Sequence, residues 1–376
     1  MKVIIFNSLL LPPSQTFIRD PAEKLEKFKA YYVGSRHVPG LDLPPDRTLV
    51  VNQGNCIGKF EEQVFKISGF APRLYRQVRQ LNPVLIHAQF GLSGTLILPW
   101  ARSLGIPLLV HYRGADATIT EETSRYTSLN HWTYFQRKEA LKKQARLFIT
   151  VSKFIKNKLL EQGFPSEKII PHYHGVDLEK FHPDIDLPRE PVILFVGRLT
   201  EKKGCEYLIQ AMAKVQSQLP EAELVLIGDG PLKPSMETLA AKLLRRYQFL
   251  GVQPPQMVKN WMNRASVLAT PSVTATDGDS EGLPNVVLEA QAMALPVVST
   301  IHAGIPEAVI HGKTGFLTQE RDVEGLATYI QRLLQEKELW QSFSMQGRDH
   351  VEANFDRTKQ TRVLESIYEA VLQGDF

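Results

Sequence analysis

The chain has 376 residues, 43% of them hydrophobic and 22% charged, which is the balance of a globular protein with hydrophobic cores. This length is too great for one ordinary domain and suits two domains of about 150–200 residues each. The formal net charge of +4 gives no reason to expect nucleic acid as a partner, although it suits contact with anionic substrates or an anionic membrane surface.

Two further features bear on the cellular compartment. Cys56 and Cys205 lie far apart without a metal-ligand spacing, so we expect two reduced thiols. No signal peptide is visible, and the uncharged stretch 80–101 contains too many polar residues and prolines for a membrane span. We expect a cytoplasmic protein, with peripheral contact at the inner membrane face as a further hypothesis.

In the first half, short apolar runs alternate with amphipathic segments. Apolar runs without period-2 alternation predict strands buried on both faces, and their alternation with helices predicts parallel βαβ units. The expected strands are Val3–Phe6, Leu49–Val51, Val84–His87, Leu108–His111 and Leu147–Val151, and the expected helices are Phe17–Tyr32, Glu61–Leu81, Leu92–Leu104, Trp132–Ala145 and Ser152–Gln162.

The second half repeats this rhythm after a proline-rich segment, Asp177–Pro191, which reads as an interdomain linker. Its expected strands are Val192–Val196, Leu224–Ile227, Gln248–Leu250, Val267–Ala269 and Val297–Ser299, and its expected helices are Cys205–Leu219, Leu232–Tyr247, Gln256–Arg264, Val286–Met293, Val323–Glu336 and Leu339–Glu352. We therefore predict an α/β protein of two doubly wound, Rossmann-like domains that face a cleft. The domains cover 1–180 and 181–355, and 356–376 form a helix that packs back on the first.

Three strand-to-helix loops of the second half contain the residues that we expect to bind a ligand. The first runs from Gly197 to Gly204, where glycine allows a tight turn and Arg198 and Lys203 supply two cations. Fixed cations stabilise a diphosphate leaving group as its negative charge develops. The second loop contains Gly228, Asp229, Gly230 and Pro231, and its glycines permit positive φ.

The third loop is the run Glu281-Gly282-Leu283-Pro284-Asn285. Pro284 suits the first helical position, and the amides around Gly282, Leu283 and Asn285 would point out of a helix N-terminus, which is a natural phosphate site. Glu281 could accept hydrogen bonds from sugar hydroxyls, and Glu289, inside the helix, could reach a ribose diol. Each loop alone also fits an ordinary strand–turn–helix connection, but three at one edge favour a shared ligand.

These motifs resemble the donor domain of glycosyltransferase family 4, the retaining enzymes of the two-domain GT-B fold, and the resemblance spans the chain. The matching runs also include Pro271-Ser272, Pro296-Val297-Val298, Gly304-Ile305-Pro306-Glu307, Gly312-Lys313-Thr314-Gly315 and a linker-like run from His174 to Pro183. The resemblance implies that Arg198 and Lys203 contact the donor diphosphate. It also implies that Glu281 contacts the donor sugar and that Glu289 binds the ribose. It also places the segment around Val252 beside the base.

The first half resembles a subgroup linked to exopolysaccharide and colanic-acid-type synthesis. Its markers are Pro13-Ser14-Gln15-Thr16-Phe17-Ile18, His87-Ala88-Gln89-Phe90-Gly91 and Arg113-Gly114-Ala115-Asp116, and we expect Ser14, Gln15 and Thr16 to take part in ligand binding. Gln89 stands where the subgroup often has histidine, and Arg113 stands where many members carry an active-site histidine. His111, two residues earlier on the same strand face, and Arg113 are the two candidates for that role, and a hydrogen-bonded strand-end residue is the alternative interpretation of His111.

Two other features carry less weight. Asp277-Gly278-Asp279 spells a metal-binding D-x-D pattern, but a flexible acidic loop explains it better, so no metal or cofactor is expected. Arg73, Arg76 and Arg79 beside the apolar Phe70, Leu74, Val78 and Leu81 suggest docking on an anionic leaflet, as does the basic run Arg137, Lys138, Lys142, Lys143, Arg146, Lys153, Lys156 and Lys158. A solvated helix face is the simpler interpretation of both.

The sequence thus predicts a retaining, metal-independent glycosyltransferase of the hexosyltransferase type. Its donor is a nucleoside diphosphate sugar, and its acceptor is a saccharide, lipid-linked or small molecule. The alternative is a nucleotide-sugar epimerase or another GT-B enzyme that uses no glycosyl acceptor, and a non-catalytic binding protein also remains open. A dinucleotide-dependent oxidoreductase is disfavoured because no G-x-G-x-x-G follows any expected strand.

Overall fold

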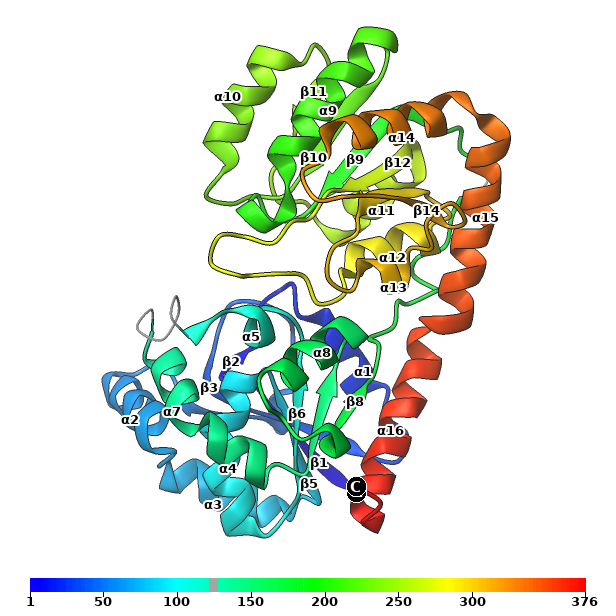
Figure 1. Cartoon of the computed structure of the whole chain (residues 1–376). Helices are drawn as coiled ribbons and strands as arrows, with labels where there is room; N and C mark the ends of the chain where they lie inside the picture. The colour runs from blue at the N-terminus through cyan, green and yellow to red at the C-terminus, as the bar shows by residue number, and fades with distance from the viewer. Residues whose placement is uncertain (122–127, 185) are drawn as a thin grey trace. The chain divides into compact units, whose positions relative to one another are not determined.

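The structure is a computed structural model that describes residues 1–121, 128–184 and 186–376. The chain forms two compact units (Figure 1). The first comprises Met1–Gly175 together with Arg357–Phe376, and the second comprises Val176–Asp356. The boundary near 175 lies slightly before the expected one at 180, and the last helix belongs to the first unit.

The first unit holds eight parallel strands and the helices that connect them. Its strands are β1 (Lys2–Phe6), β2 (Leu9–Leu10), β3 (Lys29–His37), β4 (Thr48–Asn52), β5 (Leu85–Gln89), β6 (Leu108–Tyr112), β7 (Leu147–Thr150) and β8 (Ile169–Pro171). Its described helices are α1 (Thr16–Glu23), α2 (Cys56–Ser68), α3 (Pro72–Leu81), α4 (Gly91–Leu104), α5 (Ala115–Thr118), α7 (Leu129–Gln144), α8 (Lys153–Glu161) and α16 (Arg357–Gln373), with short 3₁₀ turns at Pro45–Arg47 and Ser166–Lys168.

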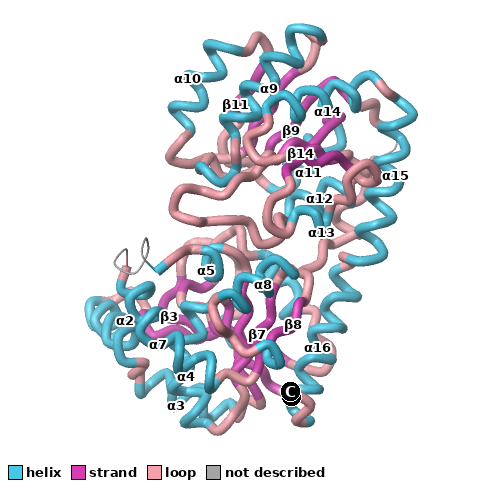
Figure 2. Tube along the Cα trace, in the orientation of Figure 1, coloured by secondary structure: helices cyan, strands magenta, loops and turns pink. Residues whose placement is uncertain are grey.

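The sheet of the first unit runs β2-β3-β1-β5-β6-β7-β8, with β4 paired to β3, and both of its faces are covered. Neighbouring residues of β6 show this, because successive side chains of a strand point to opposite faces. Leu109 belongs to the core that α1 and α16 complete, whereas Val110 lies under Gly94 of α4. Figure 2 shows the strands enclosed between these helical layers.

Helix α16 is integral to the first unit although it follows the second in sequence. Leu364, Ile367, Tyr368 and Val371 enter the core of the first sheet, and Tyr368 is fully buried. The Tyr368 hydroxyl hydrogen-bonds His87 Nδ1 at 2.6 Å, and its ring meets Phe28 edge-on at 5.3 Å. The last helix therefore completes a core that residues 1–175 would leave open.

The second unit repeats the architecture with six parallel strands. These are β9 (Glu190–Val196), β10 (Glu223–Ile227), β11 (Tyr247–Phe249), β12 (Ala265–Thr270), β13 (Val297–Thr300) and β14 (Gly315–Thr318). The helices are α9 (Cys205–Gln218), α10 (Lys233–Leu243), α11 (Pro255–Arg264), α12 (Asn285–Ala292), α13 (Ile305–Ala308), α14 (Val323–Gln335) and α15 (Lys337–Asn354), with a 3₁₀ turn at Glu201–Lys203.

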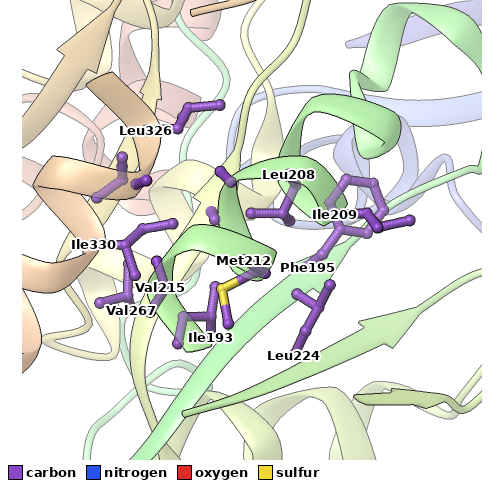
Figure 3. Close-up of a cluster of buried hydrophobic side chains, with 14 of the residues drawn as sticks. Ile193, Phe195, Leu208, Ile209, Met212, Val215, Leu224, Val267, Leu326 and Ile330 are labelled. Atoms are coloured by element: carbon purple, nitrogen blue, oxygen red, sulfur yellow. The ribbon is translucent and has the colours of Figure 1, made fainter. Parts of the chain in front are cut away.

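The strand order β11-β10-β9-β12-β13-β14 makes this sheet doubly wound: β10 and β11 extend it on one side of β9, and β12, β13 and β14 extend it on the other. One face packs against α9 and α14 in a dry core. Figure 3 shows side chains of this core pointing toward one another: Ile193, Phe195, Leu208, Ile209, Met212, Val215, Leu224, Val267, Leu326 and Ile330. Both units are thus parallel-sheet α/β domains, as the apolar runs predicted.

One predicted helix, Phe17–Tyr32, is wrong in its second half. Helix α1 ends at Glu23, and the chain then enters β3, where Ala30 pairs with Val3 and Tyr32 pairs with Ile5. The segment around Tyr31 and Tyr32 is rich in residues that favour strands, and pairing with β1 buries Tyr32 completely. Tertiary pairing therefore overrides the helical spacing of the apolar residues.

Other differences arise at turn residues. The predicted helix Glu61–Leu81 is two helices, because Gly69 adopts φ +75° at the end of α2 and Pro72 begins α3. The predicted helix Leu232–Tyr247 ends at Leu243. Strands β8 and β14 were not predicted because their apolar runs are very short.

The predicted linker Asp177–Pro191 belongs to the second unit, and β9 already begins at Glu190. Arg189 anchors this segment by donating to the carbonyl oxygens of Met262, Ala265 and Met293. Across the described ranges 1–121, 128–184 and 186–376, no helix has both the length and the apolar composition needed to cross a membrane.

The buried contacts of Tyr368 in α16 lead to a prediction about stability. Tyr368→Phe should lower the free energy of unfolding of the first unit by about 1–3 kcal/mol, because His87 Nδ1 loses its buried partner. Tyr368→Ala should cost about 3–5 kcal/mol through the cavity it leaves. Urea titration followed by hydrogen exchange of β1, β5 and α16 measures both effects in this unit alone. Val363→Ala, at a 48% exposed position of the same helix, is the control and should change little.

Candidate active site

Three loops of the second unit meet because their strands are neighbours. Strand β9 lies between β10 and β12, and all three run parallel, so the loops that follow them leave the same edge of the sheet. Ligands of doubly wound sheets bind at this carboxyl edge, at the point where the strand order reverses. The loops are residues 197–204 after β9, 228–232 after β10 and 271–284 after β12.

Backbone contacts hold the first two loops against each other. Gly197 N donates to Ile227 O at 2.9 Å, and Leu199 N donates to Asp229 O at 2.9 Å. Gly228 has φ +138°, and a Cβ at this position would lie 1.9 Å from the carbonyl oxygen of Gly197. Only glycine allows so close an approach, which explains its presence at 228.

The loop after β9 touches the loop after β12 in the same way. Gly204 has φ +63°, and a Cβ there would lie 1.9 Å from Pro271 O. Val273 N donates to Lys202 O at 2.9 Å. The three loops therefore form one rigid rim.

The predicted cation and carboxylate of this rim are in direct contact. Lys203 Nζ lies 2.6 Å from Glu281 Oε1, and the two side chains are only 17% and 8% exposed. Ser272 Oγ donates to the same carboxylate oxygen at 3.3 Å. Burial alone would raise the pKa of Glu281, but the charges of Lys203 and Lys202 outweigh it and hold this pKa below its usual value. Glu281 is therefore a carboxylate at neutral pH.

A residue that the sequence did not single out positions Glu281. The backbone N–H of Glu281 donates to His302 Nε2 at 3.2 Å, while His302 Nδ1 contacts Glu320 Oε1 at 2.7 Å. Because Glu320 is an acceptor, Nδ1 carries the proton of His302 and Nε2 accepts. Glu320 also accepts from the N–H and hydroxyl of Thr274. The signal in the sequence was a polar residue at a strand end, just before Gly304-Ile305-Pro306-Glu307.

The start of α12 lies beside this pair. Pro284 is the N-cap and Asn285 the first helical residue, which corrects the prediction of Pro284 at the first helical position. Gly282, Leu283 and Pro284 are buried, and the amides of Gly282, Leu283 and Asn285 donate no hydrogen bond within the described ranges. No side chain caps the helix. The positive end of its dipole thus has no side-chain partner among the described residues, and such a helix start favours an anion.

Of the remaining predicted donor residues, Arg198 and Asp229 lie in the rim loops, Glu289 lies in α12 and Val252 follows β11. Arg198 is exposed, and its guanidinium makes no ion pair with any residue that the structure describes. Asp229 is exposed and accepts from Gly230 N, whereas Glu289 is half-buried in α12. Val252 is 76% exposed after β11, so nothing within the described chain covers its side chain.

The D-x-D sequence, Asp277 to Asp279, lies in the loop after β12 and contacts the loop after β9. Asp279 Oδ1 contacts Lys202 Nζ at 2.9 Å, and Asp279 N donates to Asp277 Oδ1 at 2.9 Å. Asp279 thus serves as the ion-pair partner of a lysine that is 8% exposed. Across the described residues, no three histidine, cysteine or acidic side chains converge in a way that could hold a metal ion.

In the first unit, His111 and Arg113, the two candidates for the role of the family's active-site histidine, are in contact. Arg113 Nη2 lies 3.2 Å from His111 Nδ1, and Arg113 donates to Gln89 Oε1 through Nε at 3.2 Å and Nη2 at 2.8 Å. The glutamine at 89 therefore supplies the carbonyl oxygen that an arginine at 113 needs. Asp116 fixes the turn by accepting from the amides of Gly91, Arg113 and Gly114.

This contact decides the tautomer of His111. A guanidinium can only donate, so His111 Nδ1 accepts and Nε2 carries the proton. Burial and the charge of Arg113 lower the pKa of His111 well below its usual value, and burial lowers the pKa of Arg113 to about 9. At neutral pH, His111 is a neutral hydrogen-bond donor and Arg113 is the cation.

The other predicted residues of the first unit lie at the start of α1. Ser14 is exposed in a turn, Gln15 is the N-cap and Thr16 begins the helix. Gln15 Oε1 accepts from Asn7 Nδ2 at 2.8 Å. The next residue, Phe17, stacks on Arg113 with 4.7 Å between the guanidinium carbon and the ring centre. This contact links the Ser14–Phe17 marker to the His111 and Arg113 cluster.

Comparisons with known proteins place this geometry in a family. Residues 190–336 match the family described as Glycosyl transferases group 1, and residues 35–180 match Glycosyltransferase Family 4. The chain is 32% identical over 295 residues to WcaL of Salmonella typhimurium, which is named a colanic acid biosynthesis glycosyltransferase, covering 76% of this chain and 70% of that one. It is 36% identical over 230 residues to the amylovoran biosynthesis glycosyltransferase AmsK of Erwinia amylovora, covering 60% and 56%.

Solved structures agree on the fold. HepE of Anabaena, in complex with UDP and glucose, superposes with a TM-score of 0.77 at 18% identity, covering 98% of this chain and 100% of that one. Sucrose-phosphate synthase of Thermosynechococcus elongatus superposes with a TM-score of 0.80 at 21% identity, covering 100% of both chains. The two family matches and the 32% identity to WcaL show that the chain belongs to glycosyltransferase family 4, as the resemblance of its motifs implied.

Proposed function

We propose that this glycosyltransferase takes a sugar from a nucleoside diphosphate sugar held on the rim of the second unit and transfers it with retention of configuration. The observation that carries the proposal is the Lys203–Glu281 ion pair beside the open start of α12. A half-buried cation, a carboxylate and unpaired amides within one rim match the three parts of a sugar diphosphate. These parts are its charge, its hydroxyl groups and its phosphoryl oxygens.

The diphosphate binds to the positive groups. Lys203 turns from Glu281 toward the phosphoryl oxygens, Arg198 adds a second cation from the same loop, and the amides of Gly282 to Asn285 donate to the remaining oxygens. As the bond between the anomeric carbon and the phosphate oxygen breaks, charge grows on the diphosphate, and these groups stabilise it most at the transition state. They supply the positive charge that a metal ion supplies elsewhere, so we propose a metal-independent reaction.

The sugar and nucleoside occupy the neighbouring groups. Once Lys203 has turned to the diphosphate, Glu281 accepts hydrogen bonds from sugar hydroxyls. Glu289 accepts hydrogen bonds from the ribose diol, and the base lies along the segment at Val252. The new bond joins the acceptor oxygen to the anomeric carbon on the face that the phosphate leaves, and the acceptor proton passes to a departing phosphate oxygen. His111 is then a hydrogen-bond donor rather than a base, since its Nδ1 is taken by Arg113.

The names of related proteins support this class of substrates. HepE has been solved with UDP and with UDP-glucose, and a relative in Mycolicibacterium smegmatis is named as GDP-mannose-dependent. WcaL and AmsK are named for the synthesis of colanic acid and amylovoran. We propose a saccharide or lipid-linked acceptor, and a donor test has to include more than one base.

Thermal-shift measurements with UDP, GDP, ADP and dTDP sugars test donor binding. A cognate donor at a hundred times its Kd should stabilise the protein by about 2.7 kcal/mol. Lys203→Met and Arg198→Ala should each weaken binding by about tenfold or more, since each removes a charge-assisted contact to phosphate. Lys214→Met, in an exposed ion pair of the same unit, is the matched control and should leave binding unchanged.

If none of these donors stabilises the protein, or if the Lys203 and Lys214 variants behave alike, the proposed site is wrong. Proton NMR of the cognate donor incubated without acceptor separates the alternative enzyme class, because epimers have equal masses but different ring-proton signals. An epimerase would release free nucleotide or an isomerised donor, whereas the transferase should leave the donor intact apart from slow hydrolysis.

The ion pair makes a separate prediction about pH. The folded pKa of Glu281 lies below its usual value, so the pair stabilises fully above about pH 4.5 and its contribution is lost as the pH falls through the folded pKa. Glu281→Gln should therefore lower the unfolding free energy by about 3 kcal/mol at pH 7, by leaving Lys203 without its partner. The difference from wild type should shrink between pH 5 and pH 3.

Chemical denaturation at several pH values measures this difference. Glu336→Gln, which removes an exposed partner of Arg332, should cost close to nothing across the range. A gap between Glu281→Gln and wild type that stays constant from pH 7 to pH 3 would contradict the assigned charge state.

We also propose that α2 and α3 dock the enzyme on an anionic membrane surface, where a lipid-linked acceptor would be met. Leu74 and Val78 are buried and Leu81 is half-buried, so the apolar stripe expected from the sequence faces the core and only Phe70 remains exposed. The exposed apolar side chains come instead from the α2 region: Ile57, Phe60, Ile67 and Phe70 are 50–71% exposed.

These side chains lie beside exposed arginines. One hollow of about 500 Å³ is lined by Phe70, Arg76 and Arg79, and another of about 160 Å³ by Ile57 and Arg73. The second basic region is partly engaged: Lys138 donates to Gln162, Lys142 pairs with Glu139 and Lys158 pairs with Glu161. Apolar groups flanked by cations suit the headgroup region of an acidic leaflet, so α2 and α3 are the preferred docking surface.

Vesicle flotation tests this surface. The protein should float with phosphatidylglycerol vesicles at low salt and stay unbound with phosphatidylcholine. The triple change Arg73→Gln, Arg76→Gln and Arg79→Gln should weaken partitioning about 100-fold, at about 1 kcal/mol for each cation. The control changes Lys143, Arg146 and Lys153, which are also exposed, to glutamine and should retain binding. Equal loss in both triple variants would point to net charge rather than this surface.

A further inference from the structure

The first unit contains a cavity whose lining is rich in imidazole and guanidinium groups. It opens under the carboxyl ends of β5 and β6, and α1 and α16 close it. The lining includes His87, His111, His172, His174, Arg113 and Arg357. The cavity volume is about 30 Å³, which is room for about two or three water-sized atoms. A sugar ring is too large for this space.

Several polar atoms of the lining have no hydrogen-bond partner within the described residues. They are His87 Nε2, His111 Nε2, His172 Nδ1, both ring nitrogens of His174, Arg113 Nη1 and Thr361 Oγ1. The four histidines are only 2–8% exposed. A buried polar atom without a partner costs about 1–3 kcal/mol, so this concentration of unpaired atoms at one place calls for a ligand.

Neighbouring contacts identify which of these atoms are donors. His111 Nε2 carries a proton because Nδ1 accepts from Arg113, and Arg113 Nη1 is always a donor. His87 Nε2 is a third donor when the Tyr368 hydroxyl donates to His87 Nδ1. The rings of His87 and His111 are stacked, with centres 5.4 Å apart, so their donors lie close together.

His172 and His174 add groups that can become donors. His172 Nε2 donates to the Gln360 carbonyl oxygen at 2.8 Å, so its unpaired Nδ1 bears a lone pair. Burial lowers the pKa of His172 to about 4 and that of His174 to about 3, which keeps both rings neutral at pH 7. An anion in the cavity would favour their protonated forms.

None of the described lining residues carries a carboxylate that could neutralise these groups. The nearby acidic side chains are committed to other partners. Asp20 pairs with Arg357 and Arg19, and Glu365 accepts from the amides of Glu26 and Lys27. Asp116 accepts from the amides of Arg113 and Gly114 in its own turn and from the amide of Gly91 at the start of α4. The cavity therefore presents donors and positive charge without a built-in counter-ion.

A metal ion does not fit this lining, since the four imidazoles do not converge on one point within the described structure. We propose that the cavity is a binding site for a small oxyanion, a carboxylate or a terminal phosphoryl group, held by Arg113 and His111 and backed by His87, His172 and His174. The oxygens of such a group match both the size of the cavity and its unpaired donors.

The oxyanion has two possible sources: free phosphate, or an acidic group carried by the acceptor. The site itself does not depend on the proposed glycosyl transfer, and only the second source rests on it. Phe17, Arg113 and Gln360 are half-buried lining residues through which an acceptor group could enter. An acidic saccharide held there would be anchored beside the residue that replaces the family's usual histidine.

Histidine side-chain NMR on the full chain tests the proposal. The chain has 10 histidines, and ¹³Cε1 labelling makes each visible; His87→Gln, His172→Gln and His174→Gln assign the cavity signals. Titration with acetate at pH 7 and constant ionic strength should shift the signals of His87, His111, His172 and His174 with one saturating curve. Acetamide, which is neutral and of similar size, should not shift them.

Arg113→Gln should raise the Kd for acetate at least about tenfold, since it removes the only unpaired cation of the described lining. Arg137→Gln, in α7, is the matched control and should leave the Kd unchanged. Equal responses to acetate and acetamide, shifts that never saturate, or shifts confined to exposed histidines such as His37 would overturn the proposal and identify the space as a water-filled structural cavity.

Two further titrations distinguish the sources. A hexuronate that produces the same shifts at lower concentration than acetate, while its neutral hexose produces none, assigns the site to an acidic acceptor. Inorganic phosphate that saturates the signals more tightly than the hexuronate assigns it to free phosphate. Failure of all nucleotide sugars to stabilise the protein would leave these results standing, so the two proposals fail separately.

Discussion

The close approach of three loop backbones is the constraint on which the proposed donor site depends. A side chain at 228 or 204 would overlap a carbonyl oxygen of the neighbouring loop, so only glycine lets the loops after β9, β10 and β12 share one rim. That rim sets the distance between Lys203 and Glu281, which come from different loops. The sheet order brings the loops to one edge, and the glycines close the remaining distance between them.

A chain of side-chain contacts then fixes the carboxylate. Glu320 accepts a hydrogen bond from Thr274 and orients His302, and His302 Nε2 accepts from the amide of Glu281. Residues after β14 and β13 therefore support a residue of the loop after β12. Residues around a binding group act in this way by limiting its freedom before the ligand arrives. The Lys203 contact differs, because it is an ion pair that a diphosphate can replace with an equivalent one. The contacts that position Glu281 are therefore distinct from the Lys203 contact, which the proposed donor would exchange.

The sequence predicted the parts of this architecture that depend on local patterns. Buried apolar runs predicted most of the strands, and the glycine-containing loops at their ends predicted the rim. Helix Phe17–Tyr32 was wrong because pairing of β3 with β1 decides the fate of Tyr32, which no local spacing reveals. His302 was missed because its role requires two elements to meet in space. Whether His111 or Arg113 matters could not be decided from the sequence, since both contact each other and Gln89 supports the pair.

The two units neutralise their buried cations in different ways. In the second unit, Lys202 and Lys203 are each neutralised by a carboxylate of the loop after β12, so the resting rim tolerates the burial of its cations. A doubly charged diphosphate can displace such a partner, because it offers more charge and more acceptor oxygens than one carboxylate. In the first unit, the described hydrogen-bond partners of the Arg113 guanidinium, Gln89 and His111, are both neutral, and Asp116 is held by backbone amides. A weaker, singly charged group would be enough to complete the proposed site, since no carboxylate belongs to its described lining.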